Sequence, residues 1–421
     1  VWKYQYFDKT GLETSSGQRL MIHKIGKHNQ YDGPDFIEAH VQIGEISYAG
    51  HIEIHKKSSD WHLHEHGKDP RYETVILHVV WEEDQLITRN DGTQLPTLAL
   101  KGRIWLDVLR NYERLVRNQQ EILCADSLAK TAEIIRFSML EKALVERLEQ
   151  KSTSLKTVLV ETKNDWEETT YRWLFQSFGF KTNSIPMMQL AESIPYKLIQ
   201  KHAGNPFQIE AMLLGQAGLI PDQVNDAYTN LIKHEYLFYL HKYQFPNGVH
   251  AHQWVFKGVR PSNFPAIRIA QLAQLLSQSP SLFSSFLSDT PDFSGIKKLL
   301  NIQLPDYWQH HFGLGSASSR PLSKTISTGS LQLLLINAVA PLWYVYGSYI
   351  EDLSWKERTF DLMNRLPSED NFITRMYGKH SWKPMNAYDS QGMIGLYREY
   401  CQPKRCLDCK IGQNILKSPL V

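Results

Sequence analysis

The stretch 36–56, FIEAHVQIGEISYAGHIEIHK, decides the fold of the N-terminal part of the chain. Apolar and polar residues alternate over 36–43 and again over 48–56, and Gly44-Glu45 separates the two runs. A period of two is typical of a half-buried strand, and a short break containing glycine is typical of a turn. We therefore expect two strands that form a hairpin.

The sequence outside this hairpin predicts more strands and then many helices. Further strands are expected at 19–23, 74–81 and 95–100, and the continuously apolar run 74–81 is typical of a central strand covered on both faces. Beyond Leu106 the apolar residues take helical spacing. The helical segments are expected at 137–150, 165–178, 209–214, 227–239 and 267–276.

These patterns predict an α+β protein with a mixed N-terminal sheet and a large all-α region. The expected boundaries give an N-terminal domain over 1–130, a helical domain over 131–400 and a cysteine-containing tail over 401–421. A chain of 421 residues is also too long for one ordinary core.

Composition excludes some classes of function. The chain has 46 basic and 44 acidic residues, so its net charge does not by itself favour nucleic-acid binding, although a local patch can still bind phosphate. No run of eighteen uncharged apolar residues occurs, so we expect no membrane span. The stretch 331–344 is interrupted by polar residues and Pro341 and is interpreted as a buried helix. Four cysteines are too few for a disulfide scaffold, which favours the cytoplasm.

The hairpin carries a candidate metal site. Asp35 follows a Gly-Pro turn at the head of the first strand, and Glu53 lies on the second strand with His55 on the same face. Two carboxylates suit Mg²⁺ or Mn²⁺, with the Ile54 carbonyl as a further ligand. His55 or Lys56 would then contact the scissile phosphate. The alternative is structural, because Asp is common after Pro in turns and Glu is ordinary on an exposed strand face.

Histidines gather around this site. Nine of the seventeen lie between residues 23 and 78. His62, His64 and His66 are spaced for one face of an extended segment and could bind a transition metal. The spacing names no fourth ligand, so contact with phosphate or substrate is the favoured interpretation. The candidate substrate-binding residues are Asn29, Asp60, Trp61 and His64.

A second candidate metal site comes from the cysteines. Cys401, Cys406 and Cys409 fall within nine residues, and Cys124 lies far upstream. A Cys-x2-Cys pair presents two thiolates at the separation that a tetrahedral metal needs, so these residues could bind Zn²⁺ or a [4Fe–4S] cluster with Cys124 as the fourth ligand. Alternatively, Cys124 is a small buried apolar residue and the other three are reduced thiols.

Other catalytic signatures are absent from the sequence. It has no Gly-x-Ser-x-Gly nucleophile turn and no phosphate-binding Gly-x-x-x-x-Gly-Lys-Ser/Thr motif.

The chain resembles the bacterial domain-of-unknown-function family 2851, which implies no established activity. The resemblance is carried by His28-Asn29, 33–36, 50–55, 59–61, His64, Asp69, Tyr72, 75–80, Arg260-Pro261, 336–341 and 406–412. A second resemblance, to the PD-(D/E)xK nuclease superfamily, is carried by Pro34-Asp35 and Glu53-x-His55. It implies a restriction-endonuclease-like sheet in which Asp35 and Glu53 hold the metal, and it places His55 where that superfamily has Lys.

Together these features lead to a functional hypothesis. The protein would be a metal-dependent nuclease that hydrolyses phosphodiesters in DNA or RNA. The alternative is a non-catalytic nucleic-acid-binding or scaffold protein on a degenerate nuclease fold, which the exchange of Lys for His55 favours.

Overall fold

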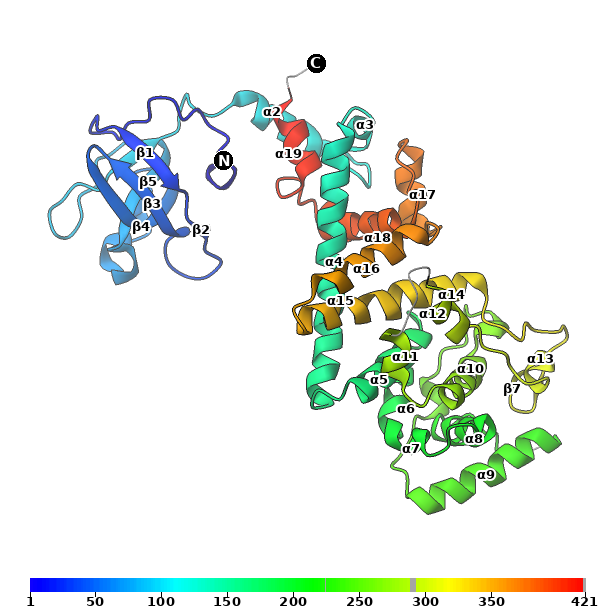
Figure 1. Cartoon of the computed structure of the whole chain (residues 1–421). Helices are drawn as coiled ribbons and strands as arrows, with labels where there is room; N and C mark the ends of the chain where they lie inside the picture. The colour runs from blue at the N-terminus through cyan, green and yellow to red at the C-terminus, as the bar shows by residue number, and fades with distance from the viewer. Residues whose placement is uncertain (224, 288–292, 419–421) are drawn as a thin grey trace. The chain divides into compact units, whose positions relative to one another are not determined.

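The computed structural model describes residues 1–223, 225–287 and 293–418 (Figure 1). The chain divides into two compact units, and each is described by itself. The first contains residues 1–136 together with 400–421, and the second contains 137–399. The C-terminal segment therefore belongs to the same unit as the N-terminal sheet.

The first unit is built on a mixed sheet, as the sequence predicts, and the sheet has six strands, one more than expected. Its strands are β1 (Leu20–Lys24), β2 (Lys27–His28), β3 (Phe36–Ile43), β4 (Ile46–Lys57), β5 (Val75–Glu82) and β6 (Thr97–Ala99). The strand order is β1-β3-β4-β5-β6, and β2 also pairs with β3. The β3/β4 pair is the expected antiparallel hairpin, whereas β5 runs parallel to both β4 and β6. The blue part of Figure 1 shows β1, β3, β4 and β5.

A bulge in β3 changes which side chains reach the core. The pairing with β4 shifts between Phe36 and Ala39, and Glu38 between them has a φ of 58°. The extra residue moves Phe36 onto the face of Ala39, so Phe36 is buried and Ile37 is only half-buried. A strict alternation through Ile37 is therefore wrong at this end of the strand.

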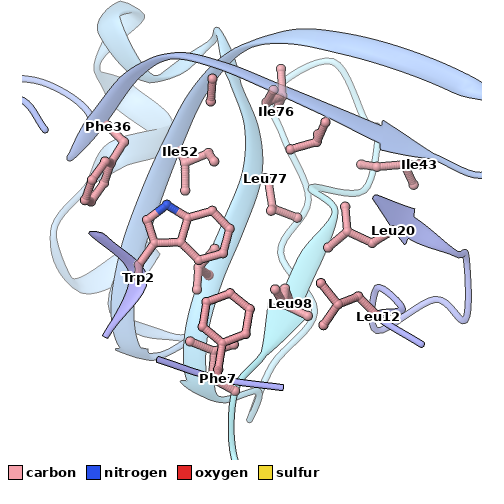
Figure 2. Close-up of a cluster of buried hydrophobic side chains, with 14 residues drawn as sticks. Trp2, Phe7, Leu12, Leu20, Phe36, Ile43, Ile52, Ile76, Leu77 and Leu98 are labelled. Atoms are coloured by element: carbon pink, nitrogen blue, oxygen red, sulfur yellow. The ribbon is translucent and has the colours of Figure 1, made fainter. Parts of the chain in front are cut away.

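One face of the sheet packs against the N-terminal segment. Trp2 and Phe7 stack with their ring centroids 5.5 Å apart and cover the buried Ile52 and Leu77 (Figure 2). The opposite face is covered at one end by α1 (Asp60–Leu63) and the turns after it, where Trp61 packs with apolar residues of a second cluster. Both faces of β5 are therefore buried, as its apolar run predicts.

In the part of the chain that the structure describes, three more helices belong to this unit, and the last of them packs against the helix that contains Asn111. They are α2 (Leu106–Arg117), α3 (Ala125–Leu128) and α19 (Lys410–Lys417). The buried amide of Asn111 donates to the carbonyl oxygens of Leu416 at 3.1 Å and Ser418 at 2.9 Å. Leu416 also packs with Tyr6 and Val108. These contacts attach the last helix to the first unit.

The second unit is helical. Its helices are α4 (Glu133–Glu161, which begins in the first unit), α5 (Trp166–Phe178), α6 (Ser184–Ser193), α7 (Tyr196–Gln200), α8 (Pro206–Gln216), α9 (Ala227–Tyr243), α10 (Pro265–Gln278), α11 (Leu282–Leu287), α12 (Ser294–Leu299), α13 (Tyr307–His310), α14 (Thr328–Leu334), α15 (Ala340–Tyr349), α16 (Leu353–Arg365), α17 (Phe372–Lys379) and α18 (Ala387–Leu396). A short hairpin of β7 (His311–Gly313) and β8 (Ser316–Ala317) accompanies them. All five predicted helical segments are present, and Asp165 caps α5 by accepting from the backbone N–H groups of residues 167 and 168.

Two π-helical turns adjoin regular helices of this unit, and the second continues into the residues of the first unit. One spans Leu335–Val339 between α14 and α15, and the other spans Tyr397–Cys401 after α18. The helical segment 328–349, which includes the first of these turns, is long enough and apolar enough to span a membrane when only length and composition are considered. In the structure, 67% of its most apolar window is buried. Core helices of soluble proteins also meet the two criteria.

Candidate metal centre

The β3/β4 hairpin brings Asp35 and Glu53 together. The backbone N–H of Asp35 donates to Glu53 Oε2 at 3.0 Å, and the Ile54 N–H donates to Asp35 Oδ2 at 3.1 Å. This reciprocal pairing follows from the register, in which Phe36 lies opposite Ile52. Each carboxylate is therefore held by the backbone of the neighbouring strand.

Three histidines converge beside Glu53. The Nε2 atom of His55 lies 3.0 Å from His64 Nδ1 and 3.3 Å from His66 Nε2. Glu53 Oε1 lies 3.3 Å from His66 Nε2 and 3.6 Å from His55 Nε2. Among the described residues, these histidines form the group of three ligand atoms that all lie within 4.8 Å of one another.

These separations fit the coordination shell of a metal ion. Zinc–nitrogen bonds of about 2.0–2.1 Å place tetrahedral ligand atoms about 3.3 Å apart. Hydrogen bonds explain the cluster less well, because a neutral imidazole has one N–H group. His55 has three close nitrogen neighbours, His78 Nε2 at 2.8 Å in addition to the other two. Its ring can donate at one nitrogen and accept at the other, so hydrogen bonds account for only two of the three contacts. A cation at the His55 Nε2 end would resolve this, with Nδ1–H donating to His78.

Buried aromatic side chains hold the imidazoles in place. His66 stacks on Tyr72 with a centroid separation of 3.8 Å, and the buried Trp61 meets His66 and His78 edge to face. His78 is fully buried on β5 and contacts His55 through its Nε2 atom. A second layer that fixes the orientation of ligating histidines is common in metal sites.

Burial sets the protonation of the cluster. Loss of solvent lowers the pKa of His55 to about 4 and that of His78 to about 3, and it also lowers the pKa of His66. These imidazoles are therefore neutral at pH 7, which is the metal-binding form. Burial, followed by the nearby Asp35 charge, raises the pKa of Glu53 to about 8. A cation would oppose that shift by stabilising the carboxylate.

A cavity of about 420 Å³ lies on the face of the sheet that Trp2 and Ile54 share, and His55 is the one residue of the histidine cluster in its lining. It is lined by Asp35 and His55 and also by two basic residues, Lys3 and His28. The Asp35 carboxyl group has a pKa raised by burial, against the hydrogen bond from Ile54 and the charge of His28.

The structure gives the other predicted residues different surroundings. Lys56 is exposed and follows His55 on the strand, so it points away from the face of Glu53. Asn29 donates to the Pro34 carbonyl at 3.1 Å and supports the loop before Asp35. Asp60 accepts from the Lys57 N–H at 3.0 Å in the turn after β4. Trp61 packs behind the histidines, and His64 belongs to the cluster.

The histidine triplet of the sequence does not form one face. Residues 60–63 form α1 and His66 begins a short 3-10 turn, so the extended segment expected here is wrong. His62 is exposed, and His55 from β4 takes the third place beside His64 and His66. The high density of histidines in this part of the sequence indicates the cluster. The spacing of these histidines does not show that His62 lies outside it.

The four cysteines lie in one neighbourhood of the first unit. None of these four residues forms a disulfide, and Cys406 and Cys409 are buried. Cys406 packs in the same apolar cluster as Cys124. Burial raises the pKa of the Cys124 thiol, and the charges of Cys401, Cys409 and Cys406 contribute to the shift. Among the described residues, the sulfur atoms do not form a group as tight as the histidine nitrogens.

Comparison with known proteins identifies a family. The family model described as "Protein of unknown function (DUF2851)" matches residues 1–372. The chain belongs to this family. No curated protein and no solved structure matches the chain. The matched range contains every residue of the histidine cluster and Cys124, and it ends before the three clustered cysteines.

Proposed function

We propose that this member of the DUF2851 family is a metal-dependent hydrolase of phosphodiesters in DNA or RNA. The proposal rests on the convergence of four atoms, His55 Nε2, His64 Nδ1, His66 Nε2 and Glu53 Oε1. His55 Nε2 lies 3.0–3.6 Å from the other three, and Glu53 Oε1 lies 3.3 Å from His66 Nε2. Imidazole nitrogens favour a transition-metal ion such as Zn²⁺ over Mg²⁺. In such a ligand set, the ion would activate water for attack on an ester.

The chain's own residues can supply the remaining steps. Asp35 lines the cavity with a carboxyl group whose raised pKa suits it to hold or transfer a proton. Lys3 and His28 line the same cavity and can contact a phosphate. His78 acts through His55 and is a positioning residue. The resemblance of Pro34-Asp35 and Glu53-x-His55 to the PD-(D/E)xK motif, with a histidine in the position of the usual lysine, is the basis for proposing this substrate class.

Two histidine variants test the proposal. His66→Ala removes a proposed ligand, and His62→Ala removes an exposed histidine four residues away that is outside the cluster. We expect the wild type to bind one transition-metal ion here and to cleave a single- or double-stranded DNA or RNA substrate. His66→Ala should lose this ion and lower the rate by orders of magnitude, and His62→Ala should retain both.

Metal analysis and cleavage assays provide the measurement. The substrates should be screened with Zn²⁺, Mn²⁺ and Mg²⁺, and Glu53→Ala serves as the background. Metal binding that depends on His66 without cleavage above the Glu53→Ala background would favour the non-catalytic scaffold. Equal metal content in the His66→Ala and His62→Ala proteins would contradict the metal centre itself.

A further inference from the structure

The helical unit contains a second polar cavity, distant in sequence from the metal centre. Its volume is about 650 Å³, which lies within the range of small-molecule sites. The lining includes Arg147 on α4, Lys181 after α5, Asn337, Gln391 on α18, and Arg398. All of these residues belong to the second unit. We propose that this cavity binds a phosphorylated small molecule of nucleotide size.

The floor of the cavity is a buried hydrogen-bonded network. Gln391 Oε1 accepts from Arg147 Nε at 2.8 Å and from Lys151 Nζ at 3.5 Å. Lys151 Nζ also donates to Asn337 Oδ1 at 2.7 Å. The Gln391 amide donates to Glu369, the one carboxylate that lines the cavity. Two cations are thus held by neutral amide oxygens.

Positive charge exceeds negative charge in this cavity. Arg147, Lys151, Lys181 and Arg398 form no ion pair with a carboxylate among the described residues. Arg398 lowers the pKa of Arg147 and of Lys151, although burial is the larger cause of both shifts. Glu369 acts against both shifts and offsets part of this charge. The remaining repulsion between like charges is unfavourable, and a bound anion reduces that cost.

The donor geometry suits a phosphate group. The Nε atom of Arg147 is used by Gln391, but its two terminal nitrogens make no hydrogen bond to the described part of the chain. A guanidinium with free terminal nitrogens can bind two phosphate oxygens at once. Lys181 and Arg398 are exposed at the cavity and can complete the anion's contacts. Phe180 and Phe372 also line the cavity and offer apolar surface to the rest of the ligand.

The backbone is irregular at the same place. Asn337 lies in the π-helical turn 335–339, and Arg398 lies in the π-helical turn 397–401. Phe180 has a φ of 50°, which is unusual for a bulky residue. π-helical turns often occur at functional sites because they redirect side chains. The two π-helical turns found in the described part of the chain each contribute a polar side chain to this one cavity, which supports a ligand site over a packing defect.

Calorimetric titration of the full chain tests the proposal. The probes are adenosine 5′-monophosphate, inorganic phosphate and adenosine, with a chelator present so that the metal centre does not contribute. We expect saturable binding of the monophosphate, weaker binding of phosphate and no binding of adenosine. Arg398→Gln should weaken monophosphate binding by roughly tenfold or more, because a charged hydrogen bond is lost.

The matched control is Arg320→Gln, an exposed arginine of the same unit that does not line the cavity. It should bind the monophosphate as the wild type does. Arg398 is exposed and makes no side-chain hydrogen bond to the described residues, so its replacement should leave folding intact, which circular dichroism checks. Absence of saturable binding, equal affinity for phosphate and monophosphate, or equal affinity in the two variants would overturn the proposal.

Discussion

The pKa of a buried carboxyl group depends on both its burial and its hydrogen bonds, and Glu210 is an example. Glu210 on α8 is fully buried and accepts hydrogen bonds from Tyr228 Oη at 2.7 Å and Trp308 Nε1 at 2.9 Å, both at Oε1. Its other oxygen has no partner among the described residues. Burial raises the pKa of Glu210 to about 7, against these two hydrogen bonds. The second oxygen therefore carries a proton below that pH.

This burial predicts a pH-dependent stability. The folded pKa of about 7 exceeds the ordinary value of 4.5, so the folded state holds the proton more tightly than the unfolded state. The contribution of Glu210 is fully present below pH 4.5 and is lost as the pH rises through 7. Glu210→Gln keeps the acceptor and removes the charge. At pH 8 it should raise the free energy of unfolding by on the order of 3 kcal/mol at most.

Thermal unfolding at pH 5 and pH 8 measures this effect. The two proteins should differ little at pH 5 and clearly at pH 8. Glu192→Gln, at an exposed position of the same unit, is the control and should not alter the pH dependence. A parallel pH dependence of the wild type and Glu210→Gln would show that Glu210 is not the titrating group.

Helix packing in the second unit depends on two glycines. α18 lies against α4, and a Cβ atom on Gly395 would lie 2.5 Å from the Ala143 carbonyl oxygen. One on Gly392 would lie 2.6 Å from Leu140 Cγ. The close approach of the two helices also brings Gln391 to Arg147 at the floor of the proposed phosphate cavity. Small residues at this contact therefore support the geometry of that cavity.

A pair of glycine variants tests the contact. Gly395→Ala should destabilise the protein by about 1–3 kcal/mol, because the methyl group would overlap a helix backbone. Gly329→Ala in α14 meets no atom within 4 Å and should be neutral or stabilising by about 0.5–1 kcal/mol, because alanine favours the helix. Chemical denaturation gives both values. Equal shifts in the two variants would exclude the steric explanation.

At the scale of the whole molecule, the chain returns to its first unit at the end. Asn111 and Tyr6 hold α19, and the Tyr4 hydroxyl donates to Asp408 at 2.7 Å. The same return brings Cys401, Cys406 and Cys409 into the neighbourhood of Cys124. A metal bound by these thiols would fasten segments that are far apart in the sequence.

We predict that the four thiols bind one zinc ion or one [4Fe–4S] cluster, separate from the histidine-bound ion. Protein purified without oxygen should contain this metal, and Cys124→Ser and Cys406→Ser should each lose it while keeping the ion that His66→Ala loses. Visible absorbance distinguishes a cluster from zinc. Four freely titratable thiols in the folded protein, with neither metal bound at them, would contradict the prediction.

The sequence by itself determined the order and type of the main elements. Period-two alternation identified β3 and β4, continuous apolarity identified β5 as central, and helical spacing identified the second unit, because side-chain periodicity directly reflects which faces are buried. The hairpin also brings Asp35 close to Glu53, because a short hairpin fixes which residues lie opposite each other.

Only the tertiary structure decided which side chains meet across elements. Of the residues that the sequence offered, it kept His55, His64 and His66 at the site and left out Lys56 and His62, because the direction of a side chain depends on strand parity and on the unexpected turn at 60–68. The periodicity of the sequence does not predict the bulge at Glu38 or the π-helical turns, because each inserts one residue into an otherwise regular element. The cavity that joins Arg147 to Arg398 likewise depends on contacts between residues distant in sequence, which periodicity does not encode.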